Sequence, residues 1–231
     1  MKNYIGPIRN STELLMSIKL STKIFKYRSK QLSHNHKEII WKQGDKIDFK
    51  NIIIMKNNEN KLIGVTRIVP RKFKLGSSII NVCGLTSICI DQKYRSKGLS
   101  KKLLTYVLNY VKKMNFDIVI LFARKFLDHY YNQFGIFGIS HYTSLTLKSS
   151  DIFKFSNIKY NTRKAKISDL KLIKKSYDFT YLKCRNVFLR NYKYWNFIYN
   201  KTILEKKNTI QVLEEKNKFL GYVIKNKNHI Y

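Results

Sequence analysis

The stretch that most constrains the fold runs from Ser87 to Leu104 and reads SICIDQKYRSKGLSKKLL. An apolar run passes through a short basic turn that contains Gly98 and enters a segment whose apolar residues recur at the spacing of one helical face. That face consists of Leu99, Leu103, Leu104, Val107, Leu108 and Val111. The order predicts a strand, a tight turn and an amphipathic helix over residues 99–113, which is typical of an α/β (α+β) protein.

The turn before this helix is suited to holding a phosphate. The first N–H groups of a helix have no partner within the helix, and the positive end of the helix dipole lies there. Arg95, Lys97 and Lys101 add positive charge, and Gly98 lets an anion approach the backbone. A basic glycine turn is weak evidence by itself, because many solvated loops share this composition.

The order of two motifs makes the interpretation more specific. Residues 95–100, RSKGLS, resemble the acetyl-CoA pyrophosphate loop of the GCN5-related N-acetyltransferases (GNAT), whose pattern is Arg or Gln, two residues, Gly, one residue, then Gly or Ala. Only Ser100 departs from that pattern; serine is small enough to fit but adds bulk. Residues 130–136, YYNQFGI, are similar to the second signature of the family: an aromatic residue, Tyr, two variable residues, a large apolar residue, Gly and an apolar residue.

The resemblance implies a GNAT fold over residues 1–148, with a mixed central sheet flanked by helices. It implies an N-acetyltransferase, an acyltransferase that moves an acetyl group from acetyl-CoA, as co-substrate, to a primary amine by direct attack. Tyr131 would be the catalytic general acid toward the CoA sulfur, although a tyrosine there also suits packing, with Tyr130 as the inward residue. The implied cofactor-binding residues are Ile88, Cys89 and Ile90, through their backbone, and Arg95, Ser96, Lys97, Gly98, Leu99, Ser100 and Lys101.

Periodicity predicts the remaining elements of the first unit. We expect a helix from Ser11 or Thr12 through Tyr27, with Ser11 as the candidate N-cap and Leu14, Leu15, Ile18 and Ile24 on its inner side. We expect strands at 4–9, 51–55, 61–69 and 81–90, a buried strand at 117–122, a helix at 127–134, and one or two strands within 136–147.

Residues 157–231 restart a similar pattern, so we expect a partial, GNAT-like second unit. Residues 218–222, KFLGY, follow an apolar run and a polar turn, as residues 61–65, KLIGV, do. The 31 residues that separate Gly64 from Arg95 would place a second phosphate loop near position 252, past Tyr231. This arrangement resembles the Eis-type tandem branch, with a truncated or degenerate second copy; the alternative is a short helical and hairpin extension.

The general base and the acceptor are not encoded in a readable motif. An alkyl ammonium must lose its proton before it attacks a thioester, yet Asp128, His129 and His141 suit surface positions. His34 and His36 have no accompanying ligands, so we expect no metal site. Residues 28–48, including Trp41, are candidates for the acceptor wall, and the acceptor is a small-molecule amine, an amino sugar, a peptide N-terminus or a lysine.

The net charge of +32 reflects 46 Lys and Arg residues against 14 Asp and Glu. Such a charge attracts nucleic acid in general. The basic residues are spread along the chain, however, and the abundance of Lys, Asn and Ile is what an AT-rich coding sequence imposes. We therefore rank nucleic-acid binding below two other interpretations, an active acetyltransferase and a noncatalytic module that binds acetyl-CoA or a partner.

The chain has no predicted membrane or metal-binding segment. No apolar run approaches the roughly 18 residues of a membrane span, and the opening MKNYIGPIRN has no signal-peptide core, so we expect a cytoplasmic protein without a membrane partner. Cys83, Cys89 and Cys184 have no metal or disulfide spacing, and we expect the first two to be reduced and buried. The oligomeric state is left open.

Overall fold

The computed structural model of the chain describes residues 4–25, 41, 48–123, 125–138, 161–184, 186–204, 208–226 and 229–230. One or two strands were expected within 136–147, and of this range only 136–138 are described; His34, His36, His141 and most of the segment 28–48 also lie outside the described residues.

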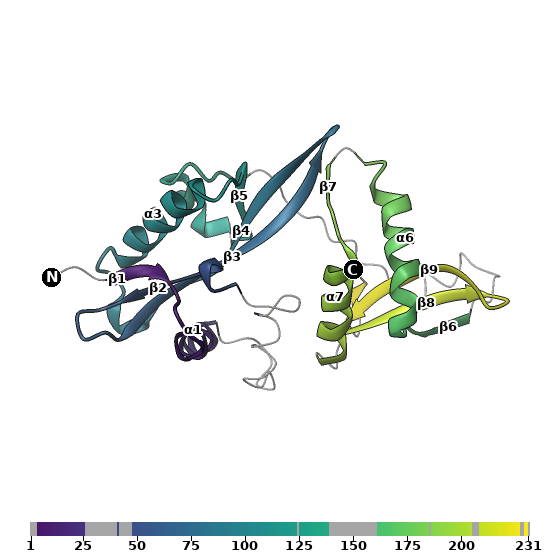
Figure 1. The fold of residues 1–231 in the computed structure, drawn as a ribbon, viewed down its shortest axis with the longest axis horizontal. Coiled ribbons are helices and arrows are strands. Elements are labelled where there is room, and N and C mark those ends of the chain that lie inside the picture. Colours follow the sequence, from purple (N-terminus) through teal and green to yellow (C-terminus); the bar gives the residue numbers. More distant parts are fainter. Residues whose placement is uncertain are drawn as a thin grey trace.

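A mixed sheet forms the N-terminal part of the chain (Figure 1). Its strands follow the order β1-β2-β3-β4-β5, and β5 runs parallel to β4 while the other neighbours are antiparallel. The bounds are β1 Tyr4–Pro7, β2 Ile52–Lys56, β3 Leu62–Leu75, β4 Ser78–Ile90 and β5 Ile118–Leu121. The expectation of a mixed central sheet flanked by helices is confirmed.

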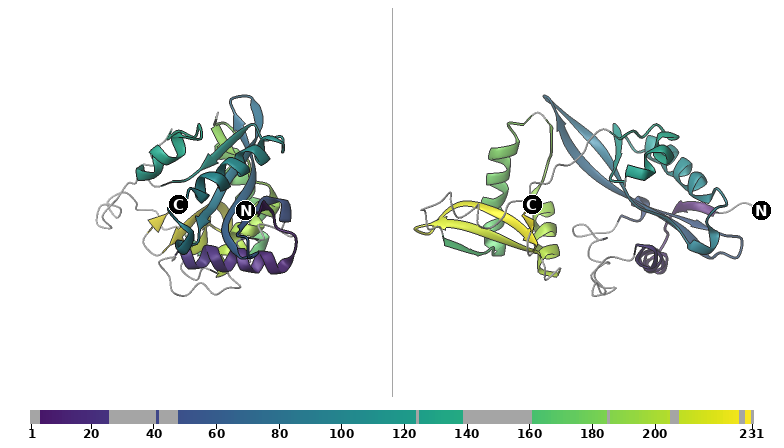
Figure 2. Two further views of the ribbon diagram at one scale, coloured as in Figure 1. Left: turned by 90° about the vertical axis from the view of Figure 1, so that its left-hand side faces the viewer. Right: turned by 180° about the vertical axis from the view of Figure 1, so that it is seen from behind.

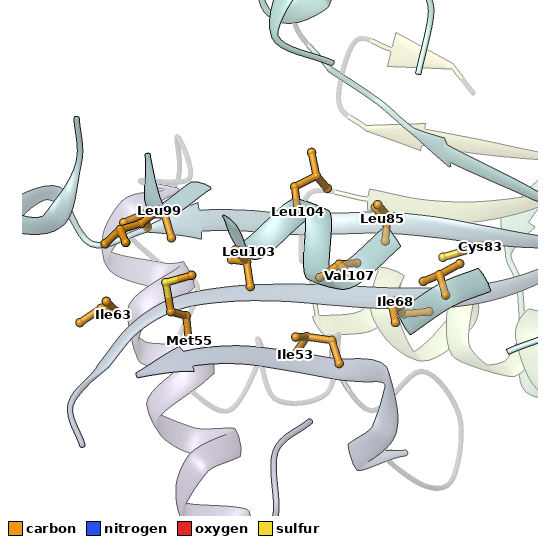
Figure 3. Close-up of a cluster of buried hydrophobic side chains, with 12 residues drawn as sticks. Ile53, Met55, Ile63, Ile68, Cys83, Leu85, Leu99, Leu103, Leu104 and Val107 are labelled. Carbon is orange, nitrogen blue, oxygen red and sulfur yellow. The ribbon is translucent and has the colours of Figure 1, made fainter. Parts of the chain in front are cut away.

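Helix α1 (Ser11–Ile24) and helix α3 (Leu99–Lys112) cover opposite faces of this sheet (Figure 2). Successive residues of β2 point to opposite faces: Ile53 and Met55 pack with α3, whereas Ile52 and Ile54 pack with α1. Figure 3 shows the α3 side, where Leu99, Leu103, Leu104 and Val107 lie against the strands. The predicted apolar face of α3 is thus the core-forming face.

Several expected boundaries differ from the structure. The N-cap of α1 is Asn10, whose Oδ1 accepts a hydrogen bond from the N–H of Glu13, so the prediction of Ser11 was wrong. Leu15 does not face inward: its side chain is 42% exposed, because the face that meets the sheet is centred on Leu14, Ser17 and Ile18. Helix α1 ends at Ile24 rather than at Tyr27.

Strand β5 is shorter and more open than the buried strand that we expected over 117–122. Among the described strands it is the last of the sheet, Ile118 is 42% exposed, and Phe122 beyond its end is 95% exposed. Helix α4 covers only Asp128–Asn132, because the chain leaves it through a turn in which Gly135 has a φ of +72°. Short 3-10 helices are η1 Phe49–Asn51, η2 Gln92–Tyr94, η3 Lys125–Leu127 and η5 Ile167–Asp169.

The C-terminal part contains a second sheet and a separate core. Antiparallel strands follow the order β10-β9-β8-β6, and a core that includes Leu170, Ile173 and Trp195 packs beside them. The bounds are β6 Asn161–Lys164, α6 Leu170–Tyr181, β7 Asn186–Phe188, α7 Tyr192–Leu204, β8 Asn208–Glu215, β9 Lys218–Asn226 and β10 His229–Ile230.

Strand β7 links the two parts of the chain. It pairs antiparallel with the far end of β3, from Phe73 to Leu75, and the Leu189 N–H donates a hydrogen bond of 2.9 Å to the Lys72 carbonyl. Strand β3 extends six residues past its predicted limit of Val69 and β4 begins three residues before Asn81, and this long hairpin reaches β7 (Figure 1). The first sheet therefore includes a strand from the C-terminal part.

Candidate active site

The last residues of β4 are displaced from the regular ladder by a β-bulge. Val65 faces Cys89 and Arg67 faces Thr86, so three steps along β4 correspond to two along β3. Ser87 lies in this bulge and has a φ of +56°, which few residues other than glycine adopt. A bulge bends its strand, so this one changes the direction of the last residues of β4, which lead into the basic turn.

Strands β4 and β5 pair only over part of their length. Pairing runs from Val82 opposite Ile118 to Leu85 opposite Leu121, where β5 ends, whereas β4 continues to Ile90. Within the described residues, the end of β4 from Thr86 to Ile90 therefore has a strand partner on the β3 side alone. No described strand pairs with the backbone edge on the β5 side there, and an extended ligand can pair with such an edge as an added strand does.

The three residues expected to line a pantetheine arm lie on this edge. The side chains of Ile88 and Ile90 pack on the α3 side, and Cys89 packs on the α1 side. Burial raises the pKa of the Cys89 thiol to about 12, so the thiol is neutral at physiological pH. Burial has the same effect on Cys83, whose pKa is also about 12, and the prediction that both are buried thiols is confirmed; Cys184 is exposed.

Asp91 anchors the start of the basic turn. Its side chain accepts a hydrogen bond of 3.1 Å from the Lys93 N–H and forms a 3.0 Å ion pair with Lys23 of α1. The Lys93 N–H and the Lys23 ammonium hold the pKa of this carboxyl below its ordinary value. No local pattern predicts this ion pair, because Lys23 and Asp91 are 68 positions apart.

The turn itself is shaped by its backbone. Ser96 and Gly98 have φ values of +61° and +68°, and Gly98 immediately precedes α3 without any side chain to cap its first turn. No atom lies within 4 Å of the position that a Cβ at Gly98 would occupy, so the space in front of the helix is open. Ser96, Lys97 and Gly98 are exposed, Ser100 is partly buried and Leu99 is buried.

Arg95 has a role that the sequence did not predict. Its Nε donates a hydrogen bond of 3.2 Å to the carbonyl of Ile90, so the side chain folds back toward the end of β4. Lys97 lies over the ring of Tyr94 at 5.9 Å, and the hydroxyl of Tyr94 accepts from Asn57 at 3.3 Å. At least one donor of Arg95 therefore holds the turn against the strand.

Tyr131 lies on α4 and packs against the same core cluster as Ile88 and α3. Its ring meets that of Tyr130 edge-on, with 5.2 Å between centroids. Burial raises the pKa of Tyr131 above its ordinary value, and the neighbouring Tyr130 adds to the rise. A phenol in this environment stays protonated at neutral pH and can donate a proton or a hydrogen bond.

The structure describes two of the three residues considered as bases. Asp128 lies beside Gly138, with one carboxylate oxygen 3.2 Å from the position of a Cβ there, and His129 is exposed. Among the described residues, no contact of Asp128 or His129 identifies either side chain as the base that deprotonates the amine. Trp41, from the segment considered for the acceptor wall, is buried in the α1 core, and the guanidinium of Arg67 lies 5.5 Å from its ring.

Two further features concern metals and membranes. The described residues contain no group of three or more His, Cys, Asp or Glu side chains that could hold a metal ion. In the same part of the chain, no helix combines the length and apolar character that crossing a lipid bilayer requires.

Comparison with known proteins agrees with this geometry. Residues 10–140 match the family model of the acetyltransferase (GNAT) domain. Because this match covers more than half of the chain, the protein belongs to the GNAT acetyltransferase family. A protein of Amsacta moorei entomopoxvirus that bears the provisional name glycylpeptide N-tetradecanoyltransferase is 26% identical over 141 residues, which are 60% of this chain and 47% of that protein.

Solved structures share the fold over nearly the whole chain. A GCN5-related N-acetyltransferase from Kribbella flavida superposes with a TM-score of 0.70 at 12% identity, covering 97% of this chain and 54% of that one. The Saccharomyces cerevisiae N-myristoyltransferase with bound myristoyl-CoA gives a TM-score of 0.64 at 12% identity, covering 96% of this chain and 59% of that one. The chain thus spans about half the length of these relatives.

Proposed function

We propose that this chain forms the acyl-CoA-binding part of an N-acyltransferase, which moves an acyl group from the thioester of CoA to a primary amine. The sequence motifs favour acetyl-CoA as the donor. The observation that carries the proposal is that β4 continues past Leu85 without β5 beside it and leads into the open turn at Gly98. An extended pantetheine arm fits along the free edge of β4, and its pyrophosphate fits in front of α3.

The proposed chemistry needs one bond to form and one to break. The neutral amine attacks the thioester carbonyl, the nitrogen–carbon bond forms, and the carbon–sulfur bond breaks to release the CoA thiolate. Tyr131 donates its phenolic proton to that thiolate, and the proton lost by the amine passes to solvent or to a base. Since burial keeps Tyr131 protonated at neutral pH, its state suits this step.

A longer acyl donor is the second candidate, and exposed aromatic side chains favour it. Phe122, Phe126 and Phe137 follow β5 and flank α4, and their exposed fractions are 95%, 70% and 64%. Each buried CH₂ group of an acyl chain is worth about 0.8 kcal/mol, so such an apolar surface can select chain length. The name of the viral relative and the myristoyl-CoA in the yeast enzyme agree with this candidate.

We also infer that the C-terminal part repeats the first half of the GNAT unit. In both parts, the strand before a helix pairs with the first strand of a following hairpin: β1 with β2, and β6 with β8. Each hairpin has a register shift near its turn, after Met55 in β2 and after Leu213 in β8, and each of these residues faces a glycine, Gly64 or Gly221.

An ion pair recurs at the same place in both parts, which further supports the repeat. Glu13 in the first turn of α1 binds Lys56, the residue after the shift in β2, at 2.7 Å. Asp169, next to α6, binds Arg163, and Arg163 also binds Glu214, the residue after the shift in β8, both at 2.7 Å. Lys56 and Glu214 occupy equivalent positions but carry opposite charges. In the C-terminal part, Arg163 therefore provides the positive charge that Lys56 provides in the N-terminal part.

The test is thermal unfolding of the purified chain with acetyl-CoA, myristoyl-CoA, CoA and ATP. A ligand present at a hundred times its dissociation constant adds about 2.7 kcal/mol to stability. A shift with the CoA compounds but not with ATP supports the proposal, and the ranking of acetyl-CoA against myristoyl-CoA selects the donor. No shift with any CoA compound contradicts the proposal, whereas binding without turnover over a panel of amines favours a noncatalytic module.

A further inference from the structure

A single carboxylate lies at the start of the basic turn. Asp91 is the only acidic residue between Glu59 and Asp117, in a stretch that is otherwise rich in Lys and Arg. A carboxylate repels a nearby anion and attracts the cations that would bind that anion. In a turn proposed to hold a pyrophosphate, Asp91 is therefore a competitor of the ligand unless the fold restrains its charge.

Arg95 is the cation most open to this competition. Its Nε donates a hydrogen bond of 3.2 Å to the carbonyl of Ile90, the residue directly before Asp91. Arginine and carboxylate groups form strong, often bidentate pairs when they meet. Among the described residues, however, Arg95 forms no ion pair with Asp91 or with any other carboxylate. The other N–H groups of its guanidinium are therefore free to bind an external anion.

Both carboxylate oxygens of Asp91 are bound by other groups. Oδ1 accepts a hydrogen bond of 3.1 Å from the Lys93 N–H, and Oδ2 forms an ion pair of 3.0 Å with the ammonium of Lys23. The side chain of Asp91 is only 13% exposed, so water has little access to it. Its pKa is held below the ordinary value by the Lys93 N–H and by Lys23, and Lys61 adds a weaker attraction. The carboxylate is thus ionised at neutral pH and held away from Arg95.

Lys23 reaches the turn from a distant part of the chain. It lies in the last turn of α1, on the face of the sheet opposite α3 (Figure 2). Its own side chain is 62% exposed, so it has no packing role that explains the contact. The one described ion pair that it forms is the pair with Asp91.

We propose that Lys23 is a positioning residue of the acyl-CoA site: by binding Asp91, it keeps the guanidinium of Arg95 free for the pyrophosphate of CoA. The inference rests on the proposed function. Without Lys23, Oδ2 of Asp91 loses its cation and Arg95 takes its place. The pyrophosphate must then displace a carboxylate from Arg95 before it binds, and this exchange lowers the affinity for CoA.

Calorimetric titration of the full chain with acetyl-CoA tests the role of Lys23. Lys23→Gln should weaken binding at least threefold, whereas Lys23→Arg, which keeps the cation, should stay within twofold of the wild type. Lys19→Gln is the matched control, because it removes the same charge from an exposed position one turn earlier in α1, and it should also stay within twofold. All three variants should unfold at nearly the wild-type temperature, since exposed ion pairs contribute little stability.

Two double variants test whether Lys23 acts through Asp91 and Arg95. Lys23→Gln combined with Asp91→Asn should bind acetyl-CoA within twofold of the wild type. The Asn Oδ1 can still accept from the Lys93 N–H, and the neutral amide does not attract Arg95. In an Arg95→Gln background, itself weaker in binding, Lys23→Gln should cost less than a further twofold, because the guanidinium that Asp91 would capture is absent.

The outcomes separate this inference from the proposed function. Equal affinities of Lys23→Gln and Lys19→Gln would overturn the role of Lys23. So would a Lys23→Gln/Asp91→Asn variant as weak as Lys23→Gln, or a full loss from Lys23→Gln in the Arg95→Gln background, because Lys23 would then act through net charge or local structure alone. A wild-type chain that binds neither acetyl-CoA nor CoA would contradict the proposed function itself and this inference with it.

Discussion

Replacing Gly98 by Asp should separate cofactor binding from folding. Gly98 has a φ of +68°, and a Cβ there meets no atom within 4 Å, so the folded state faces a conformational cost and no steric clash. For a residue with a side chain, that cost is roughly 1–2 kcal/mol. A carboxylate at a helix N-terminus returns about 0.3–1 kcal/mol, so we expect a net loss near 1 kcal/mol, or about 2–4 °C in Tm.

The effect on CoA binding should be much larger. The new carboxylate would lie where the pyrophosphate is expected, and two like charges about 4 Å apart repel by up to about 4 kcal/mol near a protein surface. Since about 1.4 kcal/mol corresponds to a tenfold change in affinity, we expect acyl-CoA to bind ten- to a thousandfold more weakly. Calorimetric titration with acetyl-CoA and CoA, alongside thermal unfolding, measures both quantities.

Gly76 offers a matched control at the tip of the β3–β4 hairpin. It has a φ of +61° and also has no atom within 4 Å of a Cβ, so Gly76→Asp carries the same conformational cost and charge away from the turn. Without the helix N-terminus to offset the cost, its Tm should fall by at least as much, while its affinity for acetyl-CoA stays within twofold of the wild type. If Gly98→Asp binds as tightly as Gly76→Asp, the assignment of the turn to the pyrophosphate is refuted.

Three further predictions concern the general acid, the core and the response to acid. Tyr131→Phe should bind acyl-CoA within twofold of the wild type but lower kcat by about 10²-fold or more in steady-state assays with an identified amine; unchanged kcat would leave Tyr131 a packing residue. Leu103→Ala, at a fully buried position, should lose about 2–5 kcal/mol in urea unfolding, whereas Leu15→Ala, at a position 42% exposed, should lose much less; equal losses would contradict the assigned face of the core. Arg163 lowers the pKa of Asp169 below its ordinary value, so the stability from this pair is complete above the unfolded pKa near about 3.9 and is lost as pH falls through the lower folded pKa. Between pH 5 and pH 2 the wild type should therefore lose more stability than Asp169→Asn, and parallel curves would argue against the pair.

Local patterns were sufficient to predict α3 and its core face. Leu99, Leu103, Leu104, Val107 and Val111 are all buried, because residues at this spacing lie on one side of any α-helix whatever it packs against. Local patterns also identified the glycine turn. A strand that is followed directly by a helix must be joined to it by a short turn, and only a few backbone conformations allow such a turn. Family membership followed from two motifs that lie close to the candidate site.

Other features depend on contacts between distant segments, and local patterns do not record these. The far ends of β3 and β4 have mixed polarity and were not predicted, because cross-strand pairing and the docking of β7 stabilise them. Leu15 has the spacing of an inner residue, yet the rotation of α1 on its sheet leaves it exposed. The positive φ of Ser87 arises from the register difference between β3 and β4, which no single strand reveals.

By itself, the sequence determined the type and order of the elements around the turn, because apolar periodicity and glycine act over a few residues. Only the tertiary structure decided that Arg95 folds back onto Ile90, that Lys23 anchors Asp91, and that β5 stops while β4 continues. It also paired β7 with the far end of β3, where Phe73 lies opposite Phe188. The physical reason is that burial and charge pairing depend on which surfaces meet, and surfaces meet only after the chain has folded.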